Sequence, residues 1–423
     1  MSDTSNSGPM LAADGTPLKK SLARALRRQK MRALMLIAPL LLFVLLTFIL
    51  PVADMLYRSV ENSIVSETLP RTVVALADWD ADGGELPDEA VYAAMAADLQ
   101  EAAKAKTHTR VGTRLNYENP GVSSLFRKAG RKAKKWDLEN DGPWKETLLE
   151  MHKGWGDPQV WRTIQTYSPP VTAGYYLNAV DMRVGPDGAE MRPENEQIYA
   201  VLFGRTMKMS LMITLSCIML GYPVAWLLAN LPARKANLLM ILVLLPFWTS
   251  LLVRTSAWKV MLQQQGVIND VLVWIGLVAD ENRLVMINNQ FGTVVAMTHI
   301  LLPFMILPMY SVMQTIPPSY LRAAKSLGAT NWTAFWRVYF PQSVPGIGAG
   351  SILVFILAIG YYITPALVGG TKGTFISNRI AFHISTSLNW GLAAALGAIL
   401  LAVVLLLYWA YDKIVGIDNV KLG

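Results

Sequence analysis

The sequence is 423 residues long, and 53% of it is hydrophobic while only 16% is charged. Soluble proteins usually carry about a quarter charged residues, so this composition excludes an ordinary soluble domain and indicates a polytopic membrane protein. In a soluble chain the net charge of +8 would suggest nucleic acid as a partner. In a membrane protein, basic residues collect on one side of the bilayer, so we expect no nucleic-acid partner.

The polar segment 1–32 ends in a basic cluster, and segment 33–57 holds the first apolar run. The cluster consists of Lys19, Lys20, Arg24, Arg27, Arg28, Lys30 and Arg32. No small-residue cleavage site follows the apolar run, so we expect an uncleaved first span rather than a signal peptide. The basic cluster predicts that this tail stays in the cytoplasm.

Residues 58–200 form a long polar insert in which acidic residues outnumber basic ones. Long loops cross membranes largely regardless of charge, so we expect the insert outside, in the periplasm. Segments 86–106 and 143–153 predict helices, which makes the insert mostly helical. We interpret the basic run 127–135 as a solvated surface rather than a binding patch.

Six runs without Asp, Glu, Lys or Arg approach the ~20 residues that a transmembrane helix needs. These runs are 33–52, 209–231, 236–253, 293–316, 344–368 and 391–411. Residues 271–279 are too short to span and predict an interfacial or re-entrant helix. We therefore expect an all-α membrane protein with six transmembrane helices, five of which lie in a core at 201–411. Alternation of the spans places the segment 317–343 and the tail 412–423 in the cytoplasm.

The cytoplasmic stretch 321–346 (LRAAKSLGATNWTAFWRVYFPQSVPG) is basic and aromatic. We expect a short helix that Gly328 ends in the left-handed conformation, and a second helix capped by Thr330 or Asn331. Pro341 is expected to break that second helix before the fifth span. Helical spacing gives the second helix an aromatic face. This face consists of Trp332, Phe335, Trp336 and Tyr339.

Two interpretations of this stretch remain open. It fits an amphipathic helix that rests in lipid headgroups, or a knob that docks in a groove of a cytoplasmic partner. Small residues favour the second interpretation, because Ala323, Ala324 and Gly328 let another backbone come close. In this interpretation the docking residues are Arg322, Ala323, Ala324, Gly328, Trp332, Phe335 and Pro341.

The stretch also resembles the EAA coupling motif of bacterial ABC importer permeases. It matches that motif at Ala323, Ala324, Gly328, Val338 and Pro341. Arg322 stands where the family usually has Glu, and Phe340 stands where it often has Leu. The position of the stretch before the penultimate span also agrees with the motif.

Three further stretches resemble spermidine/putrescine-type permeases. They are 246–258 (PFWTSLLVRTSAW), 361–370 (YYITPALVGG) and 388–397 (LNWGLAAALG). The resemblance covers roughly residues 30–57 and 200–415 and leaves out the insert. It implies the fold of a type I ABC importer permease and a polyamine or related organic cation as the solute. It also implies a cytoplasmic ATPase dimer, a second permease chain and a periplasmic solute-binding protein in the bacterial inner membrane.

The chain itself carries no nucleotide site. The nearest candidate, Gly369–Thr374, lacks the spacing of a phosphate-binding loop. The motifs of zinc proteases and serine hydrolases are absent from the sequence, and its four histidines are scattered. We therefore expect no catalytic residue, metal or cofactor in this chain, and ATP and Mg²⁺ on a partner ATPase.

Aromatic and polar residues near span ends are the candidates for a solute pathway, because Tyr and Trp rings attract organic cations. They are Trp248, Thr249, Arg254, Tyr361, Tyr362, Thr364, Asn389 and Trp390. Interface anchoring is the favoured explanation of Trp390, and snorkelling with interface anchoring explains Arg254 at least as well as a pathway role. His299, inside the fourth span, is interpreted as a hydrogen-bonded structural residue.

Functions of other classes also remain open. The predicted spans lack charged residues at the midplane, which disfavours an ion-coupled transporter. The alternatives are an ABC permease for a different solute, such as an amino-acid derivative, an opine or another organic ion, and a channel or a membrane scaffold protein that docks a partner through residues 321–340.

Overall fold

The computed structural model describes residues 18–81, 83–185 and 188–415, and most of these residues are helical. The chain divides into two compact units, Met1–Tyr57 and Arg58–Gly423. Parts of the predicted tails 1–32 and 412–423 lie outside the described residues, namely 1–17 and 416–423, which include the basic residue Lys421.

The first unit is one helix with a π-helical turn inside it. Its segments are α1 (Leu18–Val44), η1 (Leu45–Ile49) and α2 (Leu50–Arg58). The candidate span, Leu26–Arg58, buries none of its side chains, and Leu36 is 84% exposed. An apolar helix with exposed side chains suits lipid as its surroundings. The helix therefore includes the predicted first span and extends back into the basic tail.

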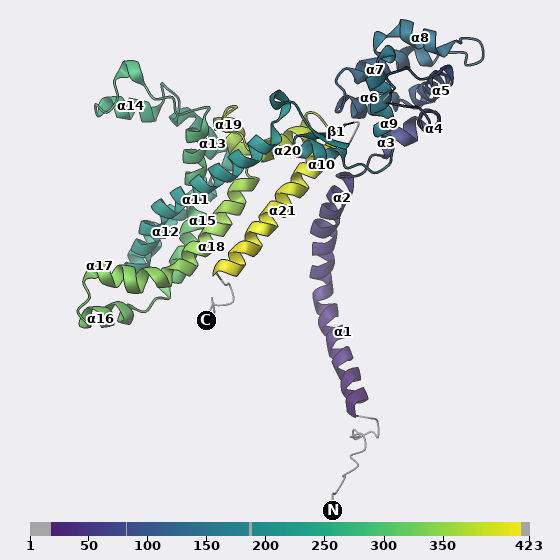
Figure 1. Ribbon diagram of the computed structural model, residues 1–423. Helices are drawn as coiled ribbons and strands as arrows, with labels where there is room; N and C mark the ends of the chain where they lie inside the picture. Colours follow the sequence, from purple (N-terminus) through teal and green to yellow (C-terminus); the bar gives the residue numbers. More distant parts are fainter. Residues whose placement is uncertain (1–17, 82, 186–187, 416–423) are drawn as a thin grey trace, which may run out of the picture. The chain divides into compact units, whose positions relative to one another are not determined.

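Residues 58–200, called the insert from here on, fold into short helices and one β-hairpin (Figure 1). The helices are α3 Ser63–Thr68, α4 Pro70–Ala75, α5 Glu89–Ala105, α6 His108–Asn116, α7 Val122–Ala133, α8 Trp144–Met151, η2 Lys153–Gly156, α9 Pro158–Thr166, α10 Gly174–Ala179 and η3 Glu194–Glu196. Strands β1 (Met182–Gly185) and β2 (Gly188–Met191) pair antiparallel. The predicted helices at 86–106 and 143–153 are confirmed as α5 and α8.

Large aromatic side chains form the core of the insert. The rings of Trp161 lie 4.6 Å from Tyr92 and 5.5 Å from Trp155, measured between centroids, and all three residues are fully buried. The Tyr92 hydroxyl and the Trp161 indole N–H both donate to the carbonyl of Trp155, at 2.7 and 3.0 Å. These two hydrogen bonds add fixed geometry to the apolar burial of the aromatic core.

The remaining helices form a bundle in which α11, α15 and α18 run side by side (Figure 1). The elements are α11 Tyr199–Asn230, α12 Ala233–Leu244, η4 Leu245–Trp248, α13 Leu251–Met261, α14 Val267–Trp274, η5 Asp280–Asn282, α15 Gln290–Gln314, α16 Pro318–Ser326, α17 Asn331–Ala334, η6 Phe335–Tyr339, α18 Phe340–Gly360, α19 Ile363–Val368, α20 Ile376–Ser385 and α21 Trp390–Val415. The segment 271–279 includes the end of α14, which is too short to span.

Glycines bring α18 close to α15. A Cβ atom at Gly346 would lie 3.0 Å from the Cα of Met309, and one at Gly350 would lie 2.7 Å from the Sδ of Met305. This G-x-x-x-G pair therefore lets the two helices pack closely. A Cβ atom at Gly360 would have nothing within 4 Å, so close packing does not explain why a glycine stands at this position.

Five described helices are long and apolar enough to cross a membrane, and a sixth span exists if a bent pair is counted as one. The bent pair joins Ala233–Trp248 to Leu251–Met261 at an angle of 95°. The prediction of one continuous helix over 236–253 is therefore wrong. The prediction for 344–368 is also wrong in this respect, because α18 ends at Gly360 and α19 is a separate helix.

The insert is joined to the bundle through buried polar contacts. The carboxylate of Asp181, itself fully buried, accepts hydrogen bonds from the backbone N–H groups of Ile198, Tyr199 and Ala200, at 2.7–3.0 Å. These N–H groups belong to the start of α11, where a carboxylate is favourable. The insert therefore caps the first helix of the bundle.

A second set of contacts joins the insert to α20 and α21. The Tyr117 hydroxyl donates to the backbone carbonyl of Ser387 at 2.6 Å. The His383 ring lies between the Tyr199 hydroxyl, 2.9 Å from Nε2, and the Ser387 hydroxyl, 2.8 Å from Nδ1. Tyr175 packs against Gly391, where a Cβ atom would come within 2.3 Å of its ring.

Candidate coupling segment and solute pathway

The predicted coupling segment, 317–343, consists of two helices that meet at Gly328. This glycine has φ +90°, the left-handed conformation expected for it. The Thr330 hydroxyl accepts a hydrogen bond from the N–H of Thr333 at 3.2 Å and so caps the second helix. Leu327, in the turn between the helices, is 89% exposed. The predicted helix–glycine–helix element is confirmed.

The aromatic residues of the second helix divide between two surfaces. Phe335 stacks on Tyr339 with ring centroids 5.9 Å apart, and both pack on the bundle core. Trp332 and Trp336 point outward, with 72% and 43% of their surfaces exposed. The inner pair fixes the helix to the bundle, while the outer pair leaves a large aromatic surface uncovered.

Three of the docking residues, Arg322, Ala323 and Ala324, lie on the first helix, α16. Arg322 and Ala323 are exposed, and Ala324 is partly buried. Among the described residues, none forms an ion pair with Arg322. In Figure 1, α16 and α17 lie at one end of the bundle, and α19 and α20 lie at the other. A partner that contacts the exposed surface of α16 and α17 must therefore approach the bundle from the end opposite α19 and α20.

Pro341 does not break the second helix, contrary to the prediction. The helix runs without interruption over Asn331–Gly360. A π-helical turn at Phe335–Tyr339 precedes the proline, and the N–H of Phe340 bonds to the carbonyl of Phe335. This wider turn accommodates a residue that lacks an N–H and would crowd a regular α-turn.

Four of the predicted pathway residues lie at the two breaks in the spans. Trp248, 75% exposed, and Thr249 lie at the bend before α13. Tyr361 and Tyr362 lie between α18 and α19. Two side chains of α20 donate hydrogen bonds to the backbone carbonyls at this second break. The Ser377 hydroxyl donates to the carbonyl of Tyr361 at 2.6 Å, and the Asn378 amide donates to the carbonyl of Tyr362 at 2.7 Å.

The helices that follow the two breaks are in contact. The hydroxyls of Thr255 in α13 and Thr364 in α19 lie 3.2 Å apart, and both residues are buried. Arg254 precedes Thr255, and its buried Nε and Nη1 atoms have no hydrogen-bond partner among the described residues. Non-helical backbone at membrane depth lies where protein or a water-filled path surrounds it. The two breaks therefore mark the region where a polar path is physically possible.

The indole of Trp258, in α13, donates to Nδ1 of His299 at 3.1 Å. This bond crosses from α13 to α15, so the structural interpretation of His299 is confirmed. The remaining two pathway residues lie elsewhere, at the first turn of α21. The Asn389 side chain accepts a bond from the N–H of Leu392 at 3.2 Å, which is a capping role, and Trp390 is 52% exposed.

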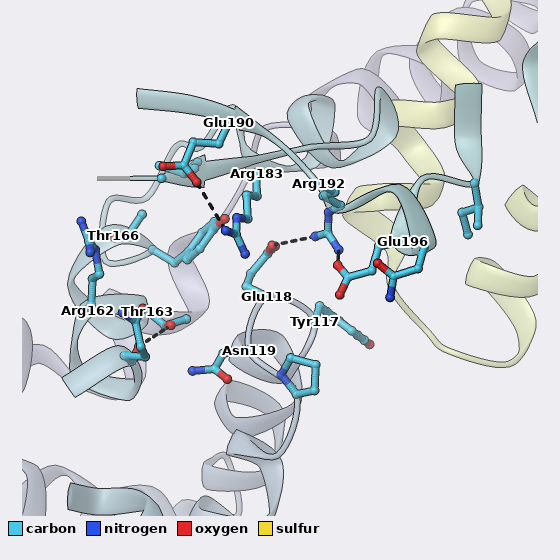
Figure 2. Close-up of a pocket in the computed structure, with 17 residues that line it drawn as sticks. Tyr117, Glu118, Asn119, Arg162, Thr163, Thr166, Arg183, Glu190, Arg192 and Glu196 are labelled. Carbon is cyan, nitrogen blue, oxygen red and sulfur yellow. Dashed lines mark hydrogen bonds and ion pairs between the residues drawn. The ribbon is translucent and has the colours of Figure 1, made fainter. Parts of the chain in front are cut away.

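A hollow of about 860 Å³ lies in the insert, between the hairpin, helix α9 and the turn that follows α6 (Figure 2). Five of its six charged lining residues pair with one another. Arg192 reaches Glu118 at 3.9 Å and Glu196 at 3.5 Å, and Arg183 reaches Glu190 at 3.4 Å. The hollow therefore has balanced charge. None of the pathway residues predicted from the sequence lines it.

Sequence reasoning missed the residues that act through distant contacts. Ser377 and Asn378 satisfy the second break, Thr255 joins the two broken spans, and Asp181 caps α11. Their residue types are common at helix ends and turns. Only the position of Ser377 and Asn378 shortly after a glycine-rich loop is a signal in the sequence, and it does not identify their acceptors.

Known proteins resemble this chain. Residues 218–415 match the family described as binding-protein-dependent transport system inner membrane component. The chain is 34% identical over 222 residues to the spermidine/putrescine transport system permease protein PotB of Salmonella typhimurium (strain SL1344), which covers 52% of this chain and 77% of that protein. The chain belongs to this family. It is a multi-pass inner-membrane permease, which is a transport component and not an enzyme, and ATP hydrolysis resides on a separate chain.

Two further proteins are similar to part of this chain. The inner membrane ABC transporter permease protein YdcU of Escherichia coli (strain K12) is 34% identical over 224 residues, covering 50% of this chain and 70% of that protein. A solved structure of a bacterial alginate ABC transporter, in complex with an alginate pentasaccharide-bound periplasmic protein, covers 53% of this chain and 80% of its own. With 19% identity and a TM-score of 0.42, that structure is too remote to refine the assignment.

Proposed function

We propose that this chain is one of two permease subunits of a type I ABC importer that brings a polyamine or a related organic cation into the bacterial cell. Six spans, with the bent pair counted as one, form half of the pore. A second, related permease chain forms the other half. An ATPase dimer, which binds ATP and Mg²⁺, docks on Arg322, Ala323, Ala324, Gly328, Trp332 and Pro341, while Phe335, predicted as a docking residue, holds the segment to the bundle. Both termini and the coupling segment face the cytoplasm, and the insert faces the periplasm.

One observation carries this proposal: a single helix connects the coupling segment to the second break. The helix Asn331–Gly360 has 30 residues, which corresponds to about 45 Å at 1.5 Å per residue. Phe335 and Tyr339 hold one end of it to the bundle, and Tyr361 and Tyr362 lie at its other end. A displacement of the docking surface by closure of the ATPase dimer thus reaches the pathway through a stiff element.

The solute assignment rests on the relatives and on the aromatic residues at the breaks. The names of the PotB relatives specify spermidine and putrescine. Trp248 and Tyr362 are exposed at the breaks, and their ring faces suit organic cations. A periplasmic solute-binding protein delivers the solute in this proposal.

Arg254 favours a second candidate, an importer of the same kind for a solute that also carries a carboxylate, such as an amino-acid derivative or an opine. Two of its guanidinium nitrogens, Nε and Nη1, are buried without a described acceptor, and the next residue, Thr255, meets Thr364 just after the second break. A buried arginine without an acceptor is costly, and a carboxylate is the acceptor it prefers. Uptake of a zwitterion that falls in Arg254→Gln, with putrescine uptake unchanged, would favour this candidate.

The first experiment is purification of the tagged chain in mild detergent from its native host, with an assay of ATP hydrolysis and identification of the proteins that accompany it. We expect a stoichiometric ATPase and a second permease. Reconstitution of this complex with its binding protein should give ATP-driven uptake of labelled putrescine or spermidine. A chain that purifies alone, without ATPase activity, would contradict the proposal.

The variant Gly328→Trp separates an importer from a channel. A side chain at φ +90° is strained although the surrounding space is open. An importer should therefore lose ATP-driven uptake while the protein still inserts in the membrane, whereas a channel should conduct as before.

A further inference from the structure

Helix α7 of the insert presents a basic face that its own domain leaves unpaired. Six exposed cations lie along and just after this helix: Arg127, Lys128, Arg131, Lys132, Lys134 and Lys135. Within the described residues, no carboxylate forms an ion pair with any of them. This is unexpected in a domain whose acidic residues outnumber its basic ones.

The orientation of this face is fixed by the core of the insert. Leu125, Phe126, Ala129 and Ala133 lie on the opposite side of α7 and are at most 3% exposed. Any rotation that hid the cations would expose these apolar side chains to water, which is unfavourable. The cations therefore stay on the surface as a fixed array, along the second half of a 12-residue helix that is about 18 Å long and just after its end.

Hydrogen-bond donors converge in a hollow of about 300 Å³ on this face. It is lined by Ser124, Arg127, Lys128, Arg131 and His152. His152 Nδ1 accepts a hydrogen bond from the N–H of Gly154 at 3.0 Å. The other ring nitrogen, Nε2, lies 3.5 Å from the hydroxyl of Ser124, which also lines the hollow. Guanidinium and ammonium groups only donate, so the complementary group is an oxygen acceptor, above all a carboxylate.

The place of α7 in the fold indicates what approaches it. The turn before α7 contains Tyr117, whose hydroxyl donates to the Ser387 carbonyl just before α21. Through the turn that leads into α7, the insert therefore touches the end of the bundle that is opposite the coupling segment. A soluble protein that docks on that end of the permease comes close to α7.

We propose that the basic face of α7 binds an acidic surface of the solute-binding protein that docks on this importer. The inference rests on the proposed function and identifies the part of the insert that takes part in delivery. A membrane surface is the weaker match. Interfacial helices insert large apolar side chains between headgroups, and residues 121–135 expose none.

The test measures how much binding protein is needed for half-maximal stimulation of ATP hydrolysis by the complete importer in lipid nanodiscs. The probe is the binding protein encoded with this permease. The variant is Arg127→Glu with Arg131→Glu, and the matched control is Lys104→Glu with Arg110→Glu. The control residues are also exposed, lie on α5 and α6, and change the charge by the same amount.

We expect the half-saturating concentration to rise about tenfold in the α7 variant at low salt, and the difference to shrink near 1 M salt, where charges are screened. The control should behave as wild type. A peptide of ten glutamates should compete with the binding protein on the wild type and not on the α7 variant.

Equal half-saturation in wild type and α7 variant, with normal stimulation, would overturn this inference and leave the proposed function intact. An equal shift in both variants would also overturn it, because total charge and not α7 would then be responsible. Binding of wild type, but not of the α7 variant, to phosphatidylglycerol vesicles with unchanged half-saturation would assign the face to lipid instead. Absence of any stimulation in the wild type would overturn the importer proposal itself.

Discussion

The insert and the bundle of spans bury different kinds of side chain. The insert hides large aromatic residues completely, such as Trp155, Trp161 and Phe126. The bundle packs flexible methionines against glycines, as at Met305 and Gly350. Water drives large apolar surfaces together, whereas lipid tails are as apolar as leucine, so helices in a bilayer associate through close packing of small residues. One chain thus contains two cores built for two solvents.

The largest expected loss of stability follows from a substitution in the core of the insert. Trp161→Ala removes a fully buried side chain and its hydrogen bond to Trp155, which should destabilise the insert by about 3–5 kcal/mol. Limited proteolysis should then cut within residues 58–200 and leave the spans protected. Cleavage spread over the whole chain would show that insert and bundle unfold together.

A pH effect is expected where the insert meets the bundle. Burial, with a smaller contribution from the Arg379 charge, lowers the pKa of His383 to about 4, below its ordinary value of about 6.5. The unfolded chain then takes up a proton at a higher pH than the folded chain, so stability is full above pH 6.5. It falls as the pH drops toward 4, by roughly 3 kcal/mol at most.

Thermal melts of the purified protein at a series of pH values measure this loss. His383→Gln should flatten the loss between pH 6.5 and 4, although it lowers the melting temperature at pH 7.5 because the bonds to Tyr199 and Ser387 change. An unaltered pH profile in this variant would assign the acid sensitivity to other groups.

A substitution that disturbs the close packing of the bundle should cause a smaller loss of stability than Trp161→Ala. A side chain at Gly350 would collide with the Sδ and the carbonyl of Met305, so Gly350→Leu should cost about 1–3 kcal/mol. Gly360→Leu is the matched control, because nothing lies within 4 Å of a Cβ atom there. Melting temperatures in detergent, followed by size-exclusion chromatography, should fall only for the first variant. Equal losses would mean that α15 and α18 do not depend on this contact.

The smallest effect on stability is expected at the exposed aromatic surface. Trp332→Ala removes a side chain that is 72% exposed, and such changes usually stay within about 0.5 kcal/mol. Uptake driven by ATP should nevertheless drop, because Trp332 belongs to the proposed docking surface. Normal uptake would exclude Trp332 from the contact with the ATPase.

Local features were predictable because neighbouring residues decide them. The left-handed turn at Gly328, the Thr330 cap and the helix α5 each depend on a few adjacent residues. The breaks at Thr249 and Tyr361 were not predictable, because apolar composition measures whether a segment prefers lipid and not whether it is straight.

By itself, the sequence determined that this is a polytopic helical membrane protein with a polar insert and a helix–glycine–helix element. Composition and spacing control these properties through solvent preference and backbone conformation. Only the tertiary structure decided where the spans break, since Ser377 and Asn378 of α20 satisfy the carbonyls left free at Tyr361 and Tyr362. It also decided that the insert caps α11 through Asp181. Buried polar groups need partners, and those partners come from distant parts of the chain.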